Sequence, residues 1–141
     1  MAKRFVFVTE DLWTDAKFLR LSTDARVLFM WSWMPPHSAV CGLYNVTPNE
    51  LGHALGASQR DGDVGRLGRV QEALSELEYA GMLRYDWAAH VLWVVNRVRY
   101  AANSPKAINY MQREVRRVHN SPLVDEFLSR YGEVLQIDRM E

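Results

Sequence analysis

The sequence predicts an α+β fold that is mostly helical. The chain has 141 residues, of which 48% are hydrophobic and 24% are charged, which is enough to bury one core and too little for two. A helix-start signal, Ser or Thr followed by Pro, occurs at Thr47-Pro48, Ser104-Pro105 and Ser121-Pro122. Two short β-rich runs also surround a four-residue loop, which is typical of a β-hairpin.

The part of the chain before residue 47 is expected to hold two short strands and a buried helix. Residues 5–8 form a β-rich run, and the apolar stretch 13–21 is interpreted as a strand or turn. Ser22 is typical of a helix N-cap, and the helix after it carries apolar residues on nearly every side until Pro35. Residues 40–46 favour a short strand, in which Gly42 marks a bulge or a close backbone approach.

Two helices are predicted next. Thr47 and Pro48, with Glu50 three residues after Thr47, form a capping box, and the helix should run to about Leu55 before Gly56 ends it. Residues 63–80 have apolar side chains three and four apart, which places them on one face of a second helix that Gly81 would end. These apolar side chains are Val64, Leu67, Val70, Leu74 and Leu77.

The rest of the chain predicts a hairpin and two helices. Residues 82–85 and 90–95 are the expected strands, joined by residues 86–89, and four side chains of the strands could share a face: Leu83, Tyr85, Leu92 and Val94. Ser104-Pro105 predicts a helix to about residue 119. Ser121-Pro122 predicts a last helix that Gly132 would close.

Helix, strand, helix, turn, helix and hairpin follow one another in the order of a winged helix-turn-helix, with two additional C-terminal helices. We expect residues 1–100 to form the winged-helix domain, including the N-terminal strand, and residues 101–141 to form a C-terminal helical extension. In this fold the helix over 63–80 would enter the major groove, which is ~12 Å wide, and the hairpin would lie along the phosphate backbone.

Two sets of motifs point to a family. The first is V-x-x-A-L-x-x-L-x-x-A-G followed by two hydrophobic residues, here from Val70 to Leu83, and it is similar to the third helix and first wing strand of bacterial and phage winged-helix proteins. The second set spans about residues 5–131: Trp13-Thr14-Asp15 with Lys17, Leu21-Ser22, Ala25-Arg26 with Leu28, Gly42-Leu43-Tyr44, Trp93-Val94-Val95-Asn96, Ser104-Pro105-Lys106, Ser121-Pro122-Leu123, and Phe127-Leu128 with Arg130-Tyr131.

The second set resembles the N-terminal domain of phage replication-initiation proteins, including replisome organisers, and more broadly DnaD-like primosome components. The resemblance implies a protein that binds an origin or duplex DNA at the start of replication. It also implies replication partners, such as a helicase or its loader. The chain departs from the family pattern at residues 59–66, which look like an insertion before the third helix.

Charge is balanced overall but unevenly spread. Residues 97–120 carry six positive residues and one negative residue, whereas residues 121–141 carry two positive and five negative residues. The basic stretch is either an anion-binding stripe or a solvated face, and the acidic tail could fold back on it. Arg69 is the expected contact to a base and Arg66 the expected phosphate clamp. The full set of predicted DNA contacts is Arg60, Arg66, Arg69, Arg84, His90, Arg97, Arg99, Lys106, Arg113, Arg116 and Arg117.

Other classes of function lack their motifs. His37 and Cys41 do not belong to a paired ligand motif for zinc, and the glycines from Gly62 to Gly68 lack the Gly-Lys-Ser/Thr ending of a phosphate loop. The acidic pairs Asp11 with Asp15 and Asp61 with Asp63 are better interpreted as caps and loops than as magnesium ligands. We therefore expect no enzyme activity, no metal and no other cofactor.

The expected location is the cytoplasm, or the host cytoplasm or nucleoid if a phage encodes the chain. No signal-peptide pattern occupies the first thirty residues, no run approaches the ~20 apolar residues of a membrane span, and the lone Cys41 fits a reducing compartment.

Two alternatives to DNA binding in replication stay open: a winged helix that docks on proteins, favoured by Glu72 and Glu76, and a transcriptional regulator. The tail helix over 123–131 could supply a homodimer or partner surface, and the chain could be a piece of a longer protein.

Overall fold

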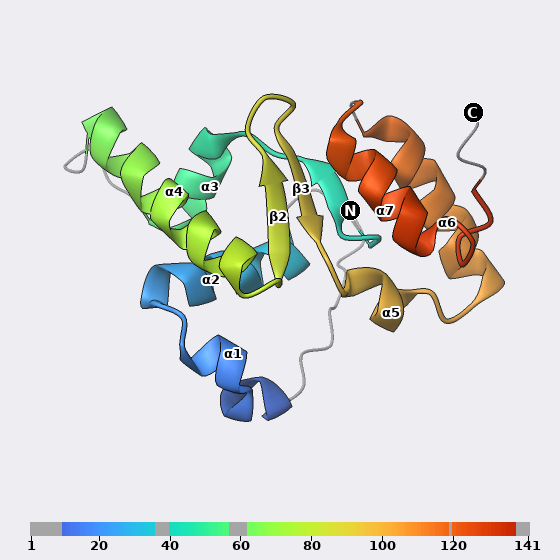
Figure 1. Ribbon diagram of the computed structural model, residues 1–141, viewed down its shortest axis with the longest axis horizontal. Coiled ribbons are helices and arrows are strands. Elements are labelled where there is room, and N and C mark those ends of the chain that lie inside the picture. The colour runs from blue at the N-terminus through green and yellow to red at the C-terminus, as the bar shows by residue number, and fades with distance from the viewer. Residues whose placement is uncertain (1–9, 36–39, 57–61, 119, 138–141) are drawn as a thin grey trace, which may run out of the picture.

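The computed structural model describes residues 10–35, 40–56, 62–118 and 120–137 (Figure 1). The described chain is mostly helical and contains a small antiparallel sheet, which confirms the predicted α+β class. The elements are the 3-10 helix η1 (Glu10–Thr14), α1 (Ala16–Leu19), α2 (Thr23–Trp33), β1 (Leu43–Asn45), α3 (Pro48–Ala54), α4 (Gly62–Tyr79), β2 (Leu83–Asp86), β3 (Val91–Val94), α5 (Arg97–Ala101), α6 (Pro105–Arg117) and α7 (Pro122–Tyr131).

The sheet has three strands in the order β1-β3-β2. The hairpin pairs Leu83 with Val94 and Tyr85 with Leu92, as the sequence predicts, and β1 pairs with the other edge of β3. The sequence predicted the strand within residues 40–46 and, separately, a two-stranded wing, so the pairing of β1 with the hairpin is the addition. β1 can join the hairpin because Gly42, with φ +76°, lets the chain approach β3: a Cβ there would lie 2.5 Å from Cβ of Arg97 and 3.1 Å from the Val94 carbonyl oxygen.

Capping side chains begin the helices where the sequence places them. Ser22 accepts a hydrogen bond from the Ala25 amide, and Ser104 accepts one from the Ala107 amide. Thr47 and Glu50 complete a capping box at α3, and Ser121 accepts a hydrogen bond from the Leu123 amide at α7. Each cap satisfies a backbone donor that the first helical turn leaves without a partner.

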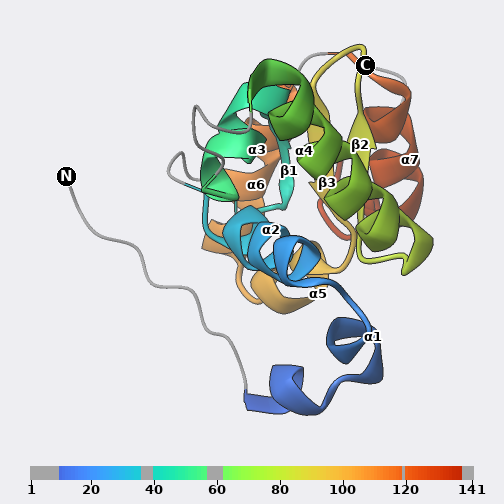
Figure 2. The same cartoon turned by 90° about the vertical axis from the view of Figure 1, so that its left-hand side faces the viewer.

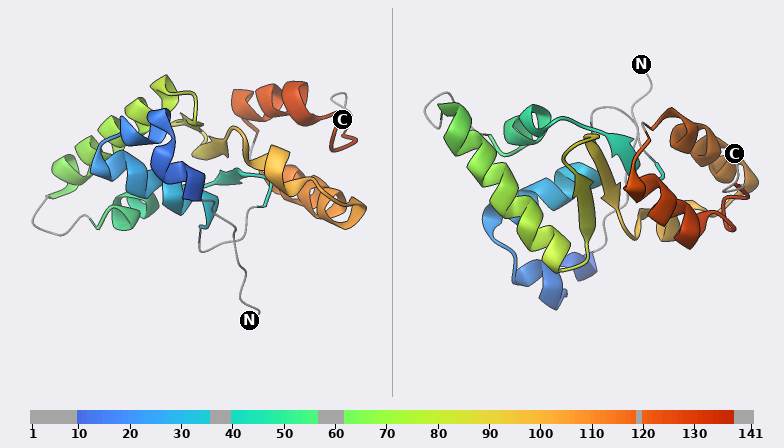
Figure 3. Two further views of the ribbon diagram at one scale, coloured as in Figure 1. Left: turned by 90° about the horizontal axis from the view of Figure 1, so that it is seen from below. Right: turned by 45° about the horizontal axis from the view of Figure 1, so that its top comes forward.

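Helices cover both faces of the sheet, with α2, α3 and α4 on one side and α6 and α7 on the other (Figures 1 and 3). Alternate residues of β3 therefore enter two hydrophobic clusters, Leu92 and Val94 in the first and Val91 and Trp93 in the second. One sheet thus supports two clusters, where the sequence suggested one core. The helices after residue 101 bury their apolar sides against strands of the preceding part of the chain.

Several local predictions were wrong. The stretch 13–21 contains the end of η1 and α1 instead of a strand, and these helices lie at one end of the molecule, below α2 in Figure 2. The short helix α5 was not predicted. Val64 and Leu67 were expected in the apolar face of α4, but they are 87% and 42% exposed because the first turns of α4 extend past the core. The predicted strand at residues 5–8 lies outside the described residues.

Candidate nucleic-acid interface

The exposed side of α4 is acidic and apolar. Glu72 and Glu78 are exposed there, together with Val64 and Leu67. Because carboxylates repel phosphates, this side is poorly suited to deep insertion into a DNA groove.

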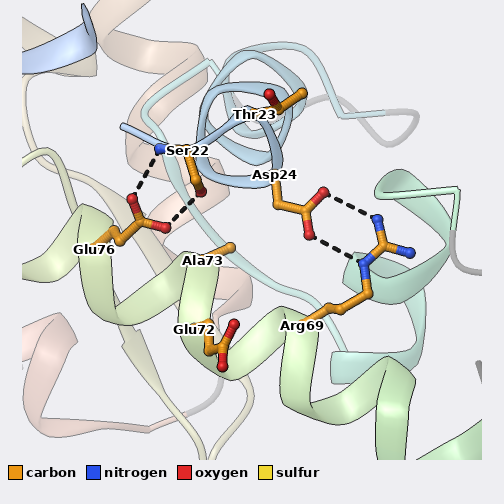
Figure 4. A pocket seen from close by; sticks show the side chains of 7 residues that line it. All are labelled: Ser22, Thr23, Asp24, Arg69, Glu72, Ala73 and Glu76. Carbon is orange, nitrogen blue, oxygen red and sulfur yellow. Dashed lines mark hydrogen bonds and ion pairs between the residues drawn. The ribbon is translucent and has the colours of Figure 1, made fainter. Parts of the chain in front are cut away.

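Arg69, the expected contact to a base, forms hydrogen bonds with two neighbouring segments of the protein. Its Nε and Nη2 atoms bond the two carboxylate oxygens of Asp24 at 3.0 and 2.9 Å, and Nη2 also donates to the Leu55 carbonyl oxygen at 3.1 Å (Figure 4). The guanidinium therefore links α4 to the first turn of α2 and to the end of α3. Its base-contacting role stays a prediction, and it would require this bidentate pair to break.

The Asp24–Arg69 pair forms one wall of a shallow hollow of about 300 Å³ (Figure 4). On the opposite wall, Glu76 accepts hydrogen bonds from the Ser22 amide at 2.8 Å and from the Ser22 hydroxyl at 2.5 Å. Glu72 also lines the hollow, so three carboxylates face one arginine. This excess of negative charge does not favour the binding of an anion in the hollow.

The Asp24–Arg69 ion pair makes the stability of the protein depend on pH in the acidic range. The hydrogen bonds from Arg69 hold the pKa of Asp24 below its usual value near 3.8, so the stabilisation is complete above about pH 4 and is lost as pH falls through the lower folded pKa. We expect Asp24→Asn to cost at most about 1 kcal/mol at neutral pH, since both side chains keep about a third of their surface in solvent. Urea unfolding at several pH values should show the difference between the variant and the natural chain shrinking as pH falls below about 4; a constant difference would contradict this role.

Arg66 packs across α3 and is only partly exposed. Its Nη1 donates to the Asn49 side-chain oxygen at 3.2 Å, and its stem lies 2.7 Å from where a Cβ on Gly52 would be. A side chain at position 52 would displace this arginine. Arg60 lies outside the described residues, as do residues 59–61 of the proposed insertion, whereas residues 62–66 form the first turns of α4.

The hairpin is tied to α7. Arg84 forms an ion pair with Glu126, and Asp86 accepts hydrogen bonds from the Ala88 and Ala89 amides and from the Ser121 hydroxyl. His90 follows at the tip with φ +53° and is half-buried. Of the two predicted wing contacts, Arg84 is therefore already partnered by a carboxylate.

The remaining predicted contacts lie on α5 and α6. Four cationic side chains of α6 are exposed, and their spacing of three, four and seven residues places them on the side opposite the buried Met111 and Val115. They are Lys106, Arg113, Arg116 and Arg117, and we call this surface the α6 basic face. Within the described chain none of the four makes an ion pair. Arg99 of α5 is likewise exposed, whereas Arg97 is partly buried with its guanidinium 4.9 Å from the centre of the Trp33 ring.

The single acid of the basic stretch points inward. The two carboxylate oxygens of Glu114, which is 9% exposed, accept hydrogen bonds from the Val40 and Cys41 amides, both at 2.9 Å. Sequence reasoning missed this role, although the apolar Met111, Val115 and Val118 around Glu114 mark its side of the helix as buried. The inward position of Glu114 leaves the α6 basic face without a carboxylate of its own helix.

The described part of the acidic tail does not neutralise the α6 basic face. Glu126 pairs with Arg84, and residues after α7 contact α6 through the Gln112 side-chain amide, which donates to the Leu135 carbonyl oxygen at 2.6 Å. The last four residues lie outside the described chain.

Neither metal-ligand clusters nor membrane-spanning helices occur among the described residues. They contain no group of three or more His, Cys, Asp and Glu side chains placed to hold a metal ion. None of their helices is both long and apolar enough to cross a membrane. Comparisons of the chain with protein-family models, with curated proteins and with solved structures found no match.

Proposed function

We propose that the protein is a winged-helix module that binds duplex DNA, with the α6 basic face as its main contact. The winged-helix assignment rests on the order α2, β1, α3, α4, β2, β3 and on the sheet order β1-β3-β2, in which a strand before the helix-turn-helix pairs with the second strand of the hairpin. The resemblance to replication-initiation proteins extends the proposal to replication in the cytoplasm, with a helicase or its loader as partner.

The observation that carries DNA binding is the α6 basic face. Lys106 and Arg117 are eleven residues apart, which is about 16 Å along a helix, and a duplex carries about nine phosphate charges over that length. Four exposed cations, with no carboxylate exposed beside them on α6, could neutralise about four of these charges. Contacts of this kind bind the backbone and carry no sequence information directly.

Binding to a random-sequence duplex over a salt series tests the proposal. With about four phosphate contacts, the logarithm of the binding constant should fall with the logarithm of salt concentration at a slope near −3.6, about −0.9 per contact. Arg113→Ala with Arg116→Ala should reduce the slope to about −1.8 and weaken binding about 60-fold at about 0.1 M salt, because each lost contact costs about eightfold there.

The matched control is Lys17→Ala with Arg20→Ala, which removes the same charge from exposed positions at α1. This control should bind as the natural chain does. Equal losses in both double variants would show a general charge effect and would contradict a specific α6 contact.

A second function, docking on a partner protein, is favoured by α4. Val64 and Leu67 are exposed on its projecting first turns, beside the exposed Glu72 on the next turns. Exposed apolar side chains rimmed by charge are typical of protein contacts. Absence of duplex binding even at low salt would favour this second function.

A further inference from the structure

Aromatic rings form a connected series from α1 to α5. The ring centres of Phe18 and Phe29 are 6.3 Å apart, those of Phe29 and Trp33 are 6.0 Å apart, and those of Trp33 and Tyr100 are 5.8 Å apart. Phe18 and Phe29 are buried, whereas Tyr100, at the end of the series, is 68% exposed. The core therefore supports an exposed aromatic ring, which loses little conformational freedom when a ligand packs on it.

Arg97 adds a positive charge behind this ring. Its guanidinium lies on the Trp33 ring, and burial lowers the pKa of Arg97, while the nearby Glu114 opposes that shift. The Nε atom of Arg97 and the Nε1 atom of Trp33 are buried and have no hydrogen-bond partner among the residues that the structure describes. Tyr100 follows Arg97 by three residues, so both side chains lie on the side of α5 that faces Trp33.

The surroundings of Tyr100 are cationic. Arg99 is exposed next to it in sequence, and the loop 102–104 leads from α5 to the first turn of α6, where Lys106 begins the α6 basic face (Figure 1). Proteins bind single-stranded nucleic acid with exposed aromatic rings next to positively charged side chains. Every base offers an apolar face for stacking, and every phosphodiester linkage carries a negative charge.

We propose that Tyr100, supported by Trp33 and Arg97, is a stacking site for an unpaired base, and that a strand leaving a duplex follows Arg99 and the α6 basic face. This inference rests on the proposed function and deepens it: the preferred substrate would be a duplex that carries a single-stranded segment. Charge complementarity favours a nucleic-acid strand over an apolar protein segment, because the exposed Arg99 next to Tyr100 and Lys106 on α6 form no ion pair within the described chain.

Fluorescence anisotropy of labelled oligonucleotides tests the site. The probes are an oligothymidylate strand of about 12 nucleotides, an oligouridylate strand of the same length and a blunt duplex. Tyr100→Ala should weaken binding of the single strands about tenfold and leave duplex binding within about twofold. Tyr100→Phe should bind like the natural chain, because it keeps the ring. Tyr79→Ala is the matched control, since Tyr79 is a 96% exposed tyrosine on α4.

The outcomes separate the two proposals. Salt-dependent duplex binding, with Tyr100→Ala and Tyr79→Ala indistinguishable on all probes, would overturn the stacking site and leave the proposed function standing. No binding of any probe by the natural chain would overturn both and favour a protein partner. A Tyr100-dependent preference for one single strand over the other would support the site and identify the strand as DNA or RNA.

Discussion

Phe127→Ala is expected to lower the free energy of unfolding by about 3–5 kcal/mol, the range for removing a buried aromatic ring from a core. Phe127 is fully buried on α7, with its ring centre 5.9 Å from that of Trp93 on β3 and 5.6 Å from that of Tyr131. Tyr131 in turn donates a hydrogen bond from its hydroxyl to the Val95 carbonyl oxygen. The cavity would therefore open at the contact between the C-terminal helices and the sheet.

The same variant tests whether residues 101–141 unfold separately. All five tryptophans lie before residue 100, and Trp93 packs against Phe127, so fluorescence reports on the preceding part of the chain and on its contact with α7, whereas circular dichroism reports on all the helices. We expect urea unfolding of Phe127→Ala to shift both signals to the same lower urea midpoint. The reason is that the two hydrophobic clusters share strand β3, so the helices on both faces of the sheet should unfold together. Ser129→Ala, at an exposed position of α7, should leave the midpoint nearly unchanged. Two separate transitions would contradict a single cooperative unit.

The features that the sequence predicted are those that depend on neighbouring residues. Ser22, Thr47, Ser104 and Ser121 begin helices because their side chains bond amides two or three residues later, and such caps can be identified from a short segment. The register of the hairpin followed in the same way from the alternation of apolar residues on both sides of a short loop.

The features that the sequence did not predict depend on residues far apart. Asp24 and Arg69 are separated by 45 residues, and Arg84 and Glu126 by 42. No local pattern shows that these arginines meet carboxylates, so both were expected to face DNA. The basic stretch on α6 could be identified from composition, but which of its charges face outward required the position of the helix against the sheet.

Glu114→Ala should destabilise the protein by about 2–6 kcal/mol, because it removes the acceptor of two amides, the part-buried Val40 and the buried Cys41, and each donor left without a partner costs about 1–3 kcal/mol. The carboxylate joins α6 to the segment before β1 across 73 residues of sequence. Glu114→Gln keeps one acceptor oxygen and should lose about half as much, whereas Glu133→Ala, at an exposed position, should lose little.

Urea unfolding of the three glutamate variants gives this order of stability directly. A Glu114→Ala variant as stable as Glu133→Ala would show that the two amides find other partners and that the carboxylate does not hold α6 in place. If the order is as expected, the acid within the basic stretch positions α6 from its buried side. The exposed side of the same helix is then left to cations alone, which is the arrangement that binding to a polyanion requires.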